Sequence, residues 1–216
     1  GARAQSAGSS RLVGIEPFDI EIGGMRGTLR AMYSLSTCWN SHRHSDGRAM
    51  LREIREMGFE YAELSHGIRM GLVEGIVQAV EAGEIRISSV HNFCPLPMGV
   101  TKPSPNLYQC SSRRAREVEM CWKHTIKTLD MARRVGARAV VLHLGSVDMR
   151  NYTDKLLSLI ERGRQHEEKY QRLCMEVDEK IEARKEPFVE RSAQFLEKLI
   201  PEAEARGLKL GIENRE

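Results

Sequence analysis

The segment that decides the fold reads Val135-Gly136-Ala137-Arg138-Ala139-Val140-Val141-Leu142-His143-Leu144-Gly145. A helical pattern ends at Gly136, a short apolar run follows, and the run closes on the polar His143. The same order of helix, glycine and apolar strand recurs at Met57-Gly58-Phe59 and at Arg206-Gly207-Leu208. Continuous apolar strands that alternate with helices are typical of a parallel sheet covered by helices.

Outward from this segment, hydrophobic periodicity predicts strands separated by helices. The strands are expected over 30–37, 59–64, 85–91, 137–144 and 208–213, and the helices over 46–57, 68–82, 112–135 and 151–206, the last broken near Pro187. Right-handed crossovers leave two closures for such a chain, an open doubly wound sheet or a barrel. The first strand–helix turn lacks a G-x-G-x-x-G pattern, so a Rossmann dinucleotide site is not supported.

Composition argues against several classes of function. Lys and Arg total 33 against 30 Asp and Glu, and this net charge of +3 makes a nucleic-acid binder a weak reading. No stretch approaches the ~20 apolar residues that a membrane-spanning helix needs, and residues 1–10 lack the apolar core of a secretory signal.

Five cysteines without a C-x-x-C pair favour reduced thiols and a cytoplasmic protein. Cys121, on a predicted helix, is expected to act as a small buried hydrophobe.

The two ends of the chain differ from its middle. Residues 1–29 are expected to form a disordered or extraneous tail, because small residues and Arg dominate the start and Gly23-Gly24 interrupts any pattern. Met32 is a candidate for the true start. The sequence stops at Glu216, directly after an apolar run, which suggests a fragment whose folded part covers 30–216.

Polar side chains with chemical potential gather where the predicted strands end. They are Trp39 and Asn40 after the first strand, Glu63 and His66 at the second, His91 and Asn92 at the third, His143 at the fourth, and Glu213 at the fifth. The carboxyl ends of the strands carry the chemistry in a barrel of parallel strands. Imidazoles and carboxylates gathered in one place indicate a divalent-metal site or a proton-transfer site.

Each of these residues also has a structural interpretation. His91 could be a histidine at the edge of the core, Glu63 could pair with a neighbouring barrel side chain, and His66 could lie on a solvated loop. Trp39 could be a pocket wall or a helix cover. Glu213 is the sharpest functional candidate, because a carboxylate that ends an apolar run is costly to bury unless it is paired or bound to a metal.

An ordered set of phrases resembles a known family. The phrases are Ser34-Leu35-Ser36-Thr37-x-Trp39-Asn40, Met57-Gly58-Phe59-x-x-x-Glu63-Leu64, Ser89-Val90-His91-Asn92, Val140-Val141-Leu142-His143-Leu144-Gly145 and Gly211-Ile212-Glu213-Asn214. Together they resemble the xylose isomerase-like TIM barrels, which group sugar phosphate isomerases and epimerases with the type IV AP endonucleases. The resemblance covers about residue 30 to the end. It implies an α/β fold, a (β/α)8 TIM barrel truncated after the fifth strand, since such barrels need about 250 residues.

The resemblance also implies a site and a reaction. Glu213 inherits the role of metal ligand and of the catalytic carboxylate, and His91 and His143 line the pocket as metal or substrate ligands. His66, Asn92 and Trp39 are the further substrate-binding candidates. The divalent ion (Mn²⁺, Mg²⁺ or Zn²⁺) acts as a Lewis acid on a small-molecule sugar or sugar phosphate, while a carboxylate moves a proton next to the carbonyl through an enediolate. Further ligands of the sugar branch, an Asp, a His and a second Glu, come from later strands.

Two rival functions stay open. The first is a zinc phosphodiesterase of the AP endonuclease type, although the low net charge fits a DNA groove poorly. The second is an inactive truncated barrel that acts only through association, with a homo-oligomer as one form, because an incomplete barrel exposes two sheet edges.

Overall fold

The chain is described as a computed structural model that covers residues 18–22, 25–29 and 33–213, with side chains from residue 33 onward. Its main body is a sheet of five parallel strands in the order β3-β4-β5-β6-β7, which is also their order along the chain. The strands span Ser34–Ser36 (β3), Tyr61–Leu64 (β4), Arg86–His91 (β5), Ala139–Leu142 (β6) and Lys209–Ile212 (β7). All five predicted strands are present, and each is shorter than predicted.

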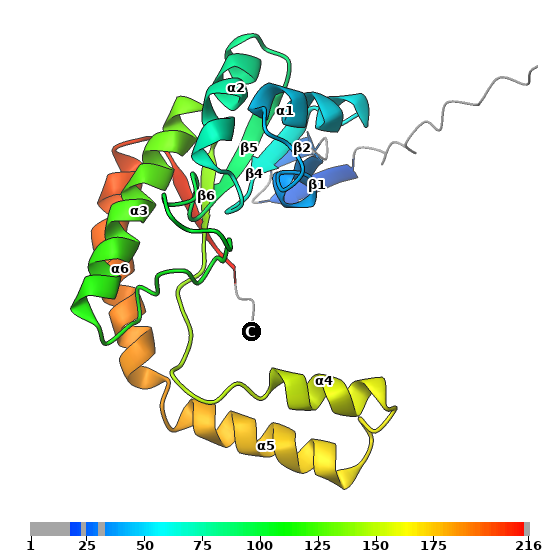
Figure 1. The fold of residues 1–216 in the computed structure, drawn as a ribbon, viewed down its shortest axis with the longest axis vertical. Helices are drawn as coiled ribbons and strands as arrows, with labels where there is room; N and C mark the ends of the chain where they lie inside the picture. Colours follow the sequence, from blue (N-terminus) through cyan, green and yellow to red (C-terminus); the bar gives the residue numbers. More distant parts are fainter. Residues whose placement is uncertain (1–17, 23–24, 30–32, 214–216) are drawn as a thin grey trace, which may run out of the picture.

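The strand order decides between the two predicted closures. A doubly wound sheet needs a point where the strand order reverses, whereas the order here runs in one direction from β3 to β7. Right-handed crossovers then place every connecting helix on the same face of the sheet. The described strands therefore form an open arc of barrel type, with helices along its outer side (Figure 1).

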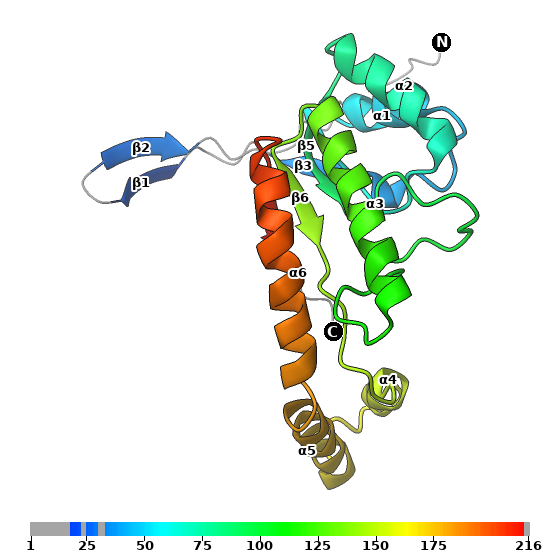
Figure 2. The same cartoon turned by 90° about the vertical axis from the view of Figure 1, so that its left-hand side faces the viewer.

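The helices follow the predicted alternation, with one difference. They are α1 (Gly47–Glu56), α2 (Met70–Glu81), α3 (Ala115–Arg134), α4 (Thr153–Glu161), α5 (Glu168–Glu182) and α6 (Glu186–Glu204), and a 3-10 turn, η1, covers Thr37–Trp39. The long helical region is three helices, and Pro187 lies in the first turn of α6, where its missing N–H costs nothing. Helices α4 and α5 form a hairpin that stands apart from the sheet (Figures 1 and 2).

The recurring glycines have a conformational reason. Gly136 and Gly207 follow α3 and α6 with φ angles of 67° and 69°, and Gly58 follows α1 with a φ of 94°. A residue with a Cβ atom is strained in this left-handed conformation. Glycine therefore ends the helix and turns the chain into the next strand. Asp46 caps α1, because its carboxylate accepts hydrogen bonds from the Arg48 and Ala49 N–H groups.

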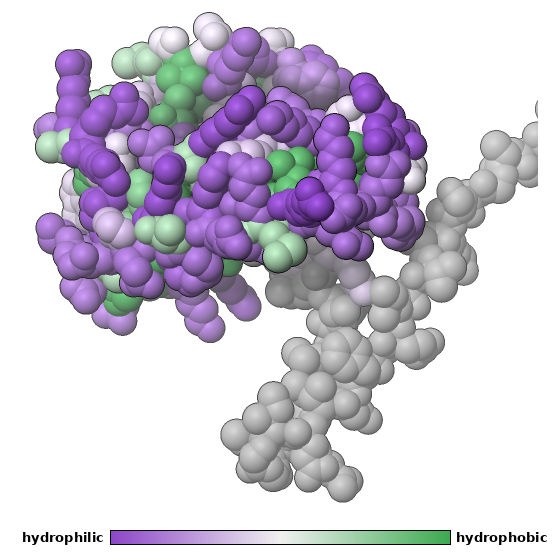
Figure 3. All heavy atoms as spheres, turned by 90° about the horizontal axis from the view of Figure 1, so that it is seen from below, coloured by the Kyte–Doolittle hydropathy of each residue, from purple (hydrophilic) through white to green (hydrophobic). Residues whose placement is uncertain are grey.

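A continuous core lies between the sheet and the helices. It includes Leu51, Ile76, Val90, Leu129 and Leu142, all at most 1% exposed. Cys121 is buried in this core, as predicted. The α4–α5 hairpin contributes little, since α5 buries none of its residues and α4 buries only Leu159. The face seen from below Figure 1 is correspondingly mainly hydrophilic (Figure 3).

The N-terminal segment differs from the predicted tail where it is described. Strands β1 (Phe18–Ile22) and β2 (Met25–Leu29) pair antiparallel in a separate two-stranded sheet, which projects away from the main body (Figure 2). Regular hydrogen bonding therefore joins 18–22 to 25–29, where a tail without regular structure was predicted. Residues 1–17 and the candidate start Met32 lie outside the described residues. Within the described ranges, no helix is long and apolar enough to cross a membrane.

The contact between α1 and α2 gives a direct test of this packing. A Cβ atom on Gly47 would lie 2.0 Å from the Leu72 carbonyl oxygen and 2.7 Å from the Ile76 nitrogen, both backbone atoms that cannot move aside alone. We expect Gly47→Ala to lower the free energy of unfolding by about 1–3 kcal/mol, because it forces the helices apart. The measurement is urea unfolding followed by circular dichroism.

Gly71→Ala on α2 is the matched control, because nothing lies within 4 Å of its Cβ position. Here the better helix propensity of Ala should raise stability by up to about 1 kcal/mol. Equal effects of the two substitutions would contradict the close approach of α1 and α2.

Candidate functional site

The carboxyl ends of three neighbouring strands bring the site together. His91 is the last residue of β5, and His143 and Glu213 directly follow β6 and β7. The parallel register pairs His91 with Val141 and Leu142 with Ile212, so His143 and Glu213 come next to each other at the following position. The Glu213 N–H donates to the Leu142 carbonyl at 3.1 Å, which extends the ladder to the site residue itself.

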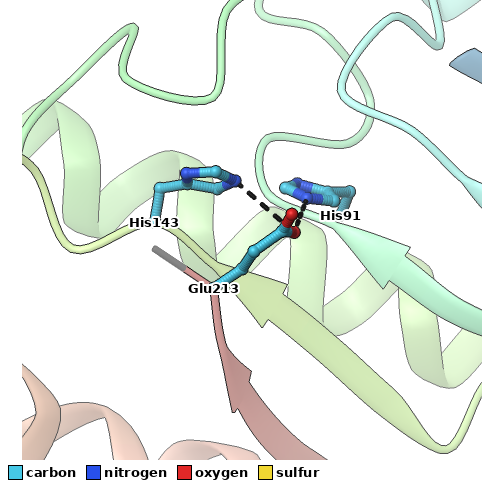
Figure 4. Close-up of side chains that lie close together, drawn as sticks. All are labelled: His91, His143 and Glu213. Carbon is cyan, nitrogen blue, oxygen red and sulfur yellow. Dashed lines mark hydrogen bonds and ion pairs between the residues drawn. The ribbon is translucent and has the colours of Figure 1, made fainter. Parts of the chain in front are cut away.

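Side-chain alternation aims these groups at the inner face of the arc. Val90 and Leu142 are buried against the helices, so His91 and His143, one position further along, point to the opposite face. There the His91 Nε2 donates to Glu213 Oε2 at 3.1 Å, and His143 Nε2 lies 3.8 Å from the same oxygen (Figure 4). The two imidazole rings are tilted by 35°, with centroids 4.9 Å apart.

The three groups differ in their access to solvent. His91 is only 8% exposed, whereas the side chain of Glu213 is 56% exposed because β7 is an edge strand of the described sheet. The arrangement is therefore a fixed pair of imidazoles with an accessible carboxylate above them. A group of this kind can hold a cation, or can exchange a proton with a molecule that enters from the open side.

The donor set fits a divalent metal ion. One ligand atom from each of His91, His143 and Glu213 lies within 4.8 Å of the others, and among the described residues no further group of three His, Cys, Asp or Glu side chains meets this criterion. Two imidazole nitrogens and a carboxylate oxygen suit Zn²⁺ and Mn²⁺, and they leave coordination positions open. The structure holds His91 and Glu213 together by a hydrogen bond, and a bound ion would take the place of that shared proton.

His66 lies at the border of this group. Its ring meets the His91 ring edge to face, with centroids 5.5 Å apart and an interplanar angle of 70°. It does not belong to the group of potential metal ligands. The prediction of His66 as a substrate contact therefore remains compatible with its place, but it lies next to the cluster instead of completing it.

Asn92 has a different role from the predicted one. Its side chain is buried between β5 and α3, where its amide nitrogen donates to Thr125 Oγ1 at 2.9 Å and its oxygen accepts from Thr128 Oγ1 at 2.9 Å. Asn92 follows His91 by one position and so faces the helices, away from the site. The two threonines, one turn apart on α3, are the partners that the sequence analysis missed. Their spacing on one helix face is the signal that could have found them.

Trp39 is likewise not brought into the cluster. Its side chain lies in η1 at 42% exposure, and the Arg43 guanidinium covers its ring at 4.1 Å from the centroid. The loop that carries this pair is held by Glu53, which accepts hydrogen bonds from Asn40, His44 and Arg43. These bonds lower the pKa of Glu53 to about 2.

Glu63 pairs within the barrel wall, one of the two predicted possibilities. Its carboxylate accepts a hydrogen bond from Ser89 Oγ at 2.8 Å, and Ser89 stands two residues before His91 on the same strand. Glu63 thus lies one layer deeper than the cluster, on the neighbouring strand. A carboxylate and a hydroxyl therefore line the inner face directly below the site.

The fold of this chain is similar to that of several solved structures. No protein-family model and no curated protein matches the sequence. Among solved structures, a D-tagatose 3-epimerase-like protein matches with a TM-score of 0.53 at 14% identity, covering 85% of this chain and 53% of its own. A candidate xylose isomerase of Rhodospirillum rubrum gives a TM-score of 0.52 at 14% identity, covering 83% and 53%. The D-allulose 3-epimerase of a Methylomonas species, solved with D-allulose, gives 0.50 at 10% identity, covering 84% and 50%.

The chain spans about half the length of these structures, and identities this low establish the fold alone. The five-stranded parallel arc with its outer helices agrees with the barrel that the sequence phrases predict. The chain therefore has the TIM-barrel fold of these structures, over about half of the barrel.

Proposed function

We propose that this chain supplies one wall of the active site of a sugar isomerase or epimerase. The observation that carries the proposal is that the imidazoles of His91 and His143 both approach Glu213 Oε2. The three residues lie at the carboxyl ends of adjoining strands. The solved structures of the same fold support the choice of substrate class, since their names describe ketose epimerases and a xylose isomerase.

In this proposal the buried imidazoles and the exposed carboxylate have different roles. His91, the last residue of β5, and His143, which follows β6, would provide two nitrogen ligands for a divalent ion such as Mn²⁺, Mg²⁺ or Zn²⁺. The ion would supply a Lewis acid for the sugar carbonyl. Glu213, with its accessible carboxylate, would complete the ligand set or accept the proton from the carbon next to that carbonyl and hold it until its return.

The substrate in this proposal is an open-chain sugar or sugar phosphate. Its hydroxyl and carbonyl oxygens would enter from the side on which Glu213 is exposed. His66 lies beside His91 and would contact the sugar at the border of the site. Groups from the remainder of a complete barrel would face these residues across the axis, since the described strands form only an arc.

Metal affinity tests the ligand assignment. We expect the chain to bind Mn²⁺, and Glu213→Gln to weaken this binding by at least about 10-fold, because loss of even an indirect partner of a metal ligand has effects of this size. The measurement is the amplitude of the free Mn²⁺ signal in electron paramagnetic resonance during titration. Glu74→Gln is the control, since Glu74 is an exposed carboxylate on α2 that contacts Gln78. Equal Mn²⁺ affinities for the two variants would contradict the assignment.

The two histidines next to His91 should differ in the same titration. His143→Ala removes a nitrogen 3.8 Å from the Glu213 carboxylate and should weaken Mn²⁺ binding by at least about 10-fold. His66 lies outside the group of potential metal ligands, so His66→Ala should change the affinity far less. A larger effect at His66 than at His143 would show that the ion lies elsewhere.

Proton transfer is tested in deuterated water. With Mn²⁺ and D-allulose present, we expect deuterium to enter the ketose at the carbon next to the carbonyl, followed by ¹H NMR, and we expect Glu213→Gln to abolish this exchange. Glu74→Gln should exchange at the original rate. Exchange at an unchanged rate in the Glu213→Gln variant, or no exchange with the unsubstituted chain, would contradict a role of this chain in proton transfer.

A further inference from the structure

The backbone around the candidate metal ligand His91 is held on both sides. Val90, before it, is fully buried against the helices, and Asn92, after it, is 3% exposed. The Asn92 N–H donates to the Val141 carbonyl of β6 at 2.9 Å, while the Asn92 side chain turns toward α3. His91 therefore lies between two fixed neighbours at the end of β5.

The Asn92 amide is matched to two threonine hydroxyls of α3. Its nitrogen donates to Thr125 Oγ1 and its oxygen accepts from Thr128 Oγ1, both at 2.9 Å. Thr128 Oγ1 also accepts a hydrogen bond from the Cys94 N–H at 2.9 Å. Both threonines are at 0% exposure, so solvent does not compete for these bonds. Buried polar networks of this kind make the segments that they join rigid.

The backbone of Asn92 faces the ring of His91. The His91 Nδ1 lies 3.4 Å from the Asn92 carbonyl oxygen, and the His91 Nε2 lies 3.1 Å from Glu213 Oε2. When Nε2 binds an ion, Nδ1 keeps the ring proton, and the Asn92 carbonyl is the acceptor within reach of that proton. Acceptors in this place fix the orientation of a metal-bound imidazole.

We propose that Asn92 and Thr128 are positioning residues for His91. Thr128 fastens the segment after β5 to α3, through the Asn92 amide and the Cys94 N–H. The Asn92 carbonyl, fixed in this way, sets the rotation of the imidazole so that its Nε2 faces Glu213. This inference rests on the proposed function, because it assigns the pair a part in ion binding without contact to the ion.

Two substitutions of Thr128 test the role of its hydroxyl. Thr128→Val keeps the shape of the side chain, removes both hydrogen bonds, and should weaken Mn²⁺ binding by at least about 10-fold. Thr128→Ser keeps the hydroxyl and should restore the affinity. The measurement is the Mn²⁺ titration by electron paramagnetic resonance, with the fold of each variant checked by circular dichroism. Thr125→Val, which removes the acceptor of the Asn92 amide nitrogen, is a second variant and should also weaken binding.

Thr37→Val is the matched control. Thr37 is also a threonine at 0% exposure, and its hydroxyl accepts a hydrogen bond from a backbone N–H, that of Ser65 at 2.8 Å. It lies in η1, so its loss should lower the stability in urea and leave the Mn²⁺ affinity unchanged. Equal weakening of Mn²⁺ binding by Thr37→Val and Thr128→Val would overturn the proposal, as would an unchanged affinity in Thr128→Val.

A second measurement needs no metal and separates this inference from the proposed function. We expect the ring signals of His91 in the ¹³C-histidine-labelled chain, recorded by NMR and assigned with a His91→Gln variant, to broaden or split in Thr128→Val. Thr128→Ser and Thr37→Val should keep the original signals. If the unsubstituted chain binds no Mn²⁺ but Thr128→Val changes these signals, the proposed function fails and the positioning of the ring stands. Unchanged His91 signals in Thr128→Val would overturn the positioning itself.

Discussion

The arrangement of the molecule depends on one constraint, the in-register pairing of parallel strands. Because β5, β6 and β7 pair in one direction, their carboxyl ends meet at the same rim. Because side chains alternate, the burial of Val90 and Leu142 against the helices directs His91 and His143 to the inner face. A shift of one residue in either pairing would turn these imidazoles into the core and break the contact with Glu213.

Much of the strand–helix order and of the candidate site could be predicted from the sequence, because it depends on local patterns of residues. The glycines after α1, α3 and α6 have the positive φ angles that only glycine adopts at low cost, so the phrase of helix, glycine and strand located three of the strands. The strand-end histidines and Glu213 stand out because polar residues close apolar runs. The choice between an open sheet and a barrel needed the strand order, which local pattern does not contain.

The differences have physical reasons as well. Asn92 is polar and stands at a strand end, but its position one residue after His91 turns it toward the α3 threonines. Trp39 was predicted from its place after the first strand and from the family resemblance. The loop around Glu53, which places Arg43 over the Trp39 ring, depends on contacts between segments.

The central claim is that an ion binds between His91, His143 and Glu213. The most direct measurement is a crystal of the chain soaked in Mn²⁺, with diffraction data recorded on both sides of the manganese absorption edge. The account predicts an anomalous difference peak about 2.0–2.2 Å from the two imidazole nitrogens and the Glu213 oxygen. A peak at any other place, or a map without one, would contradict it.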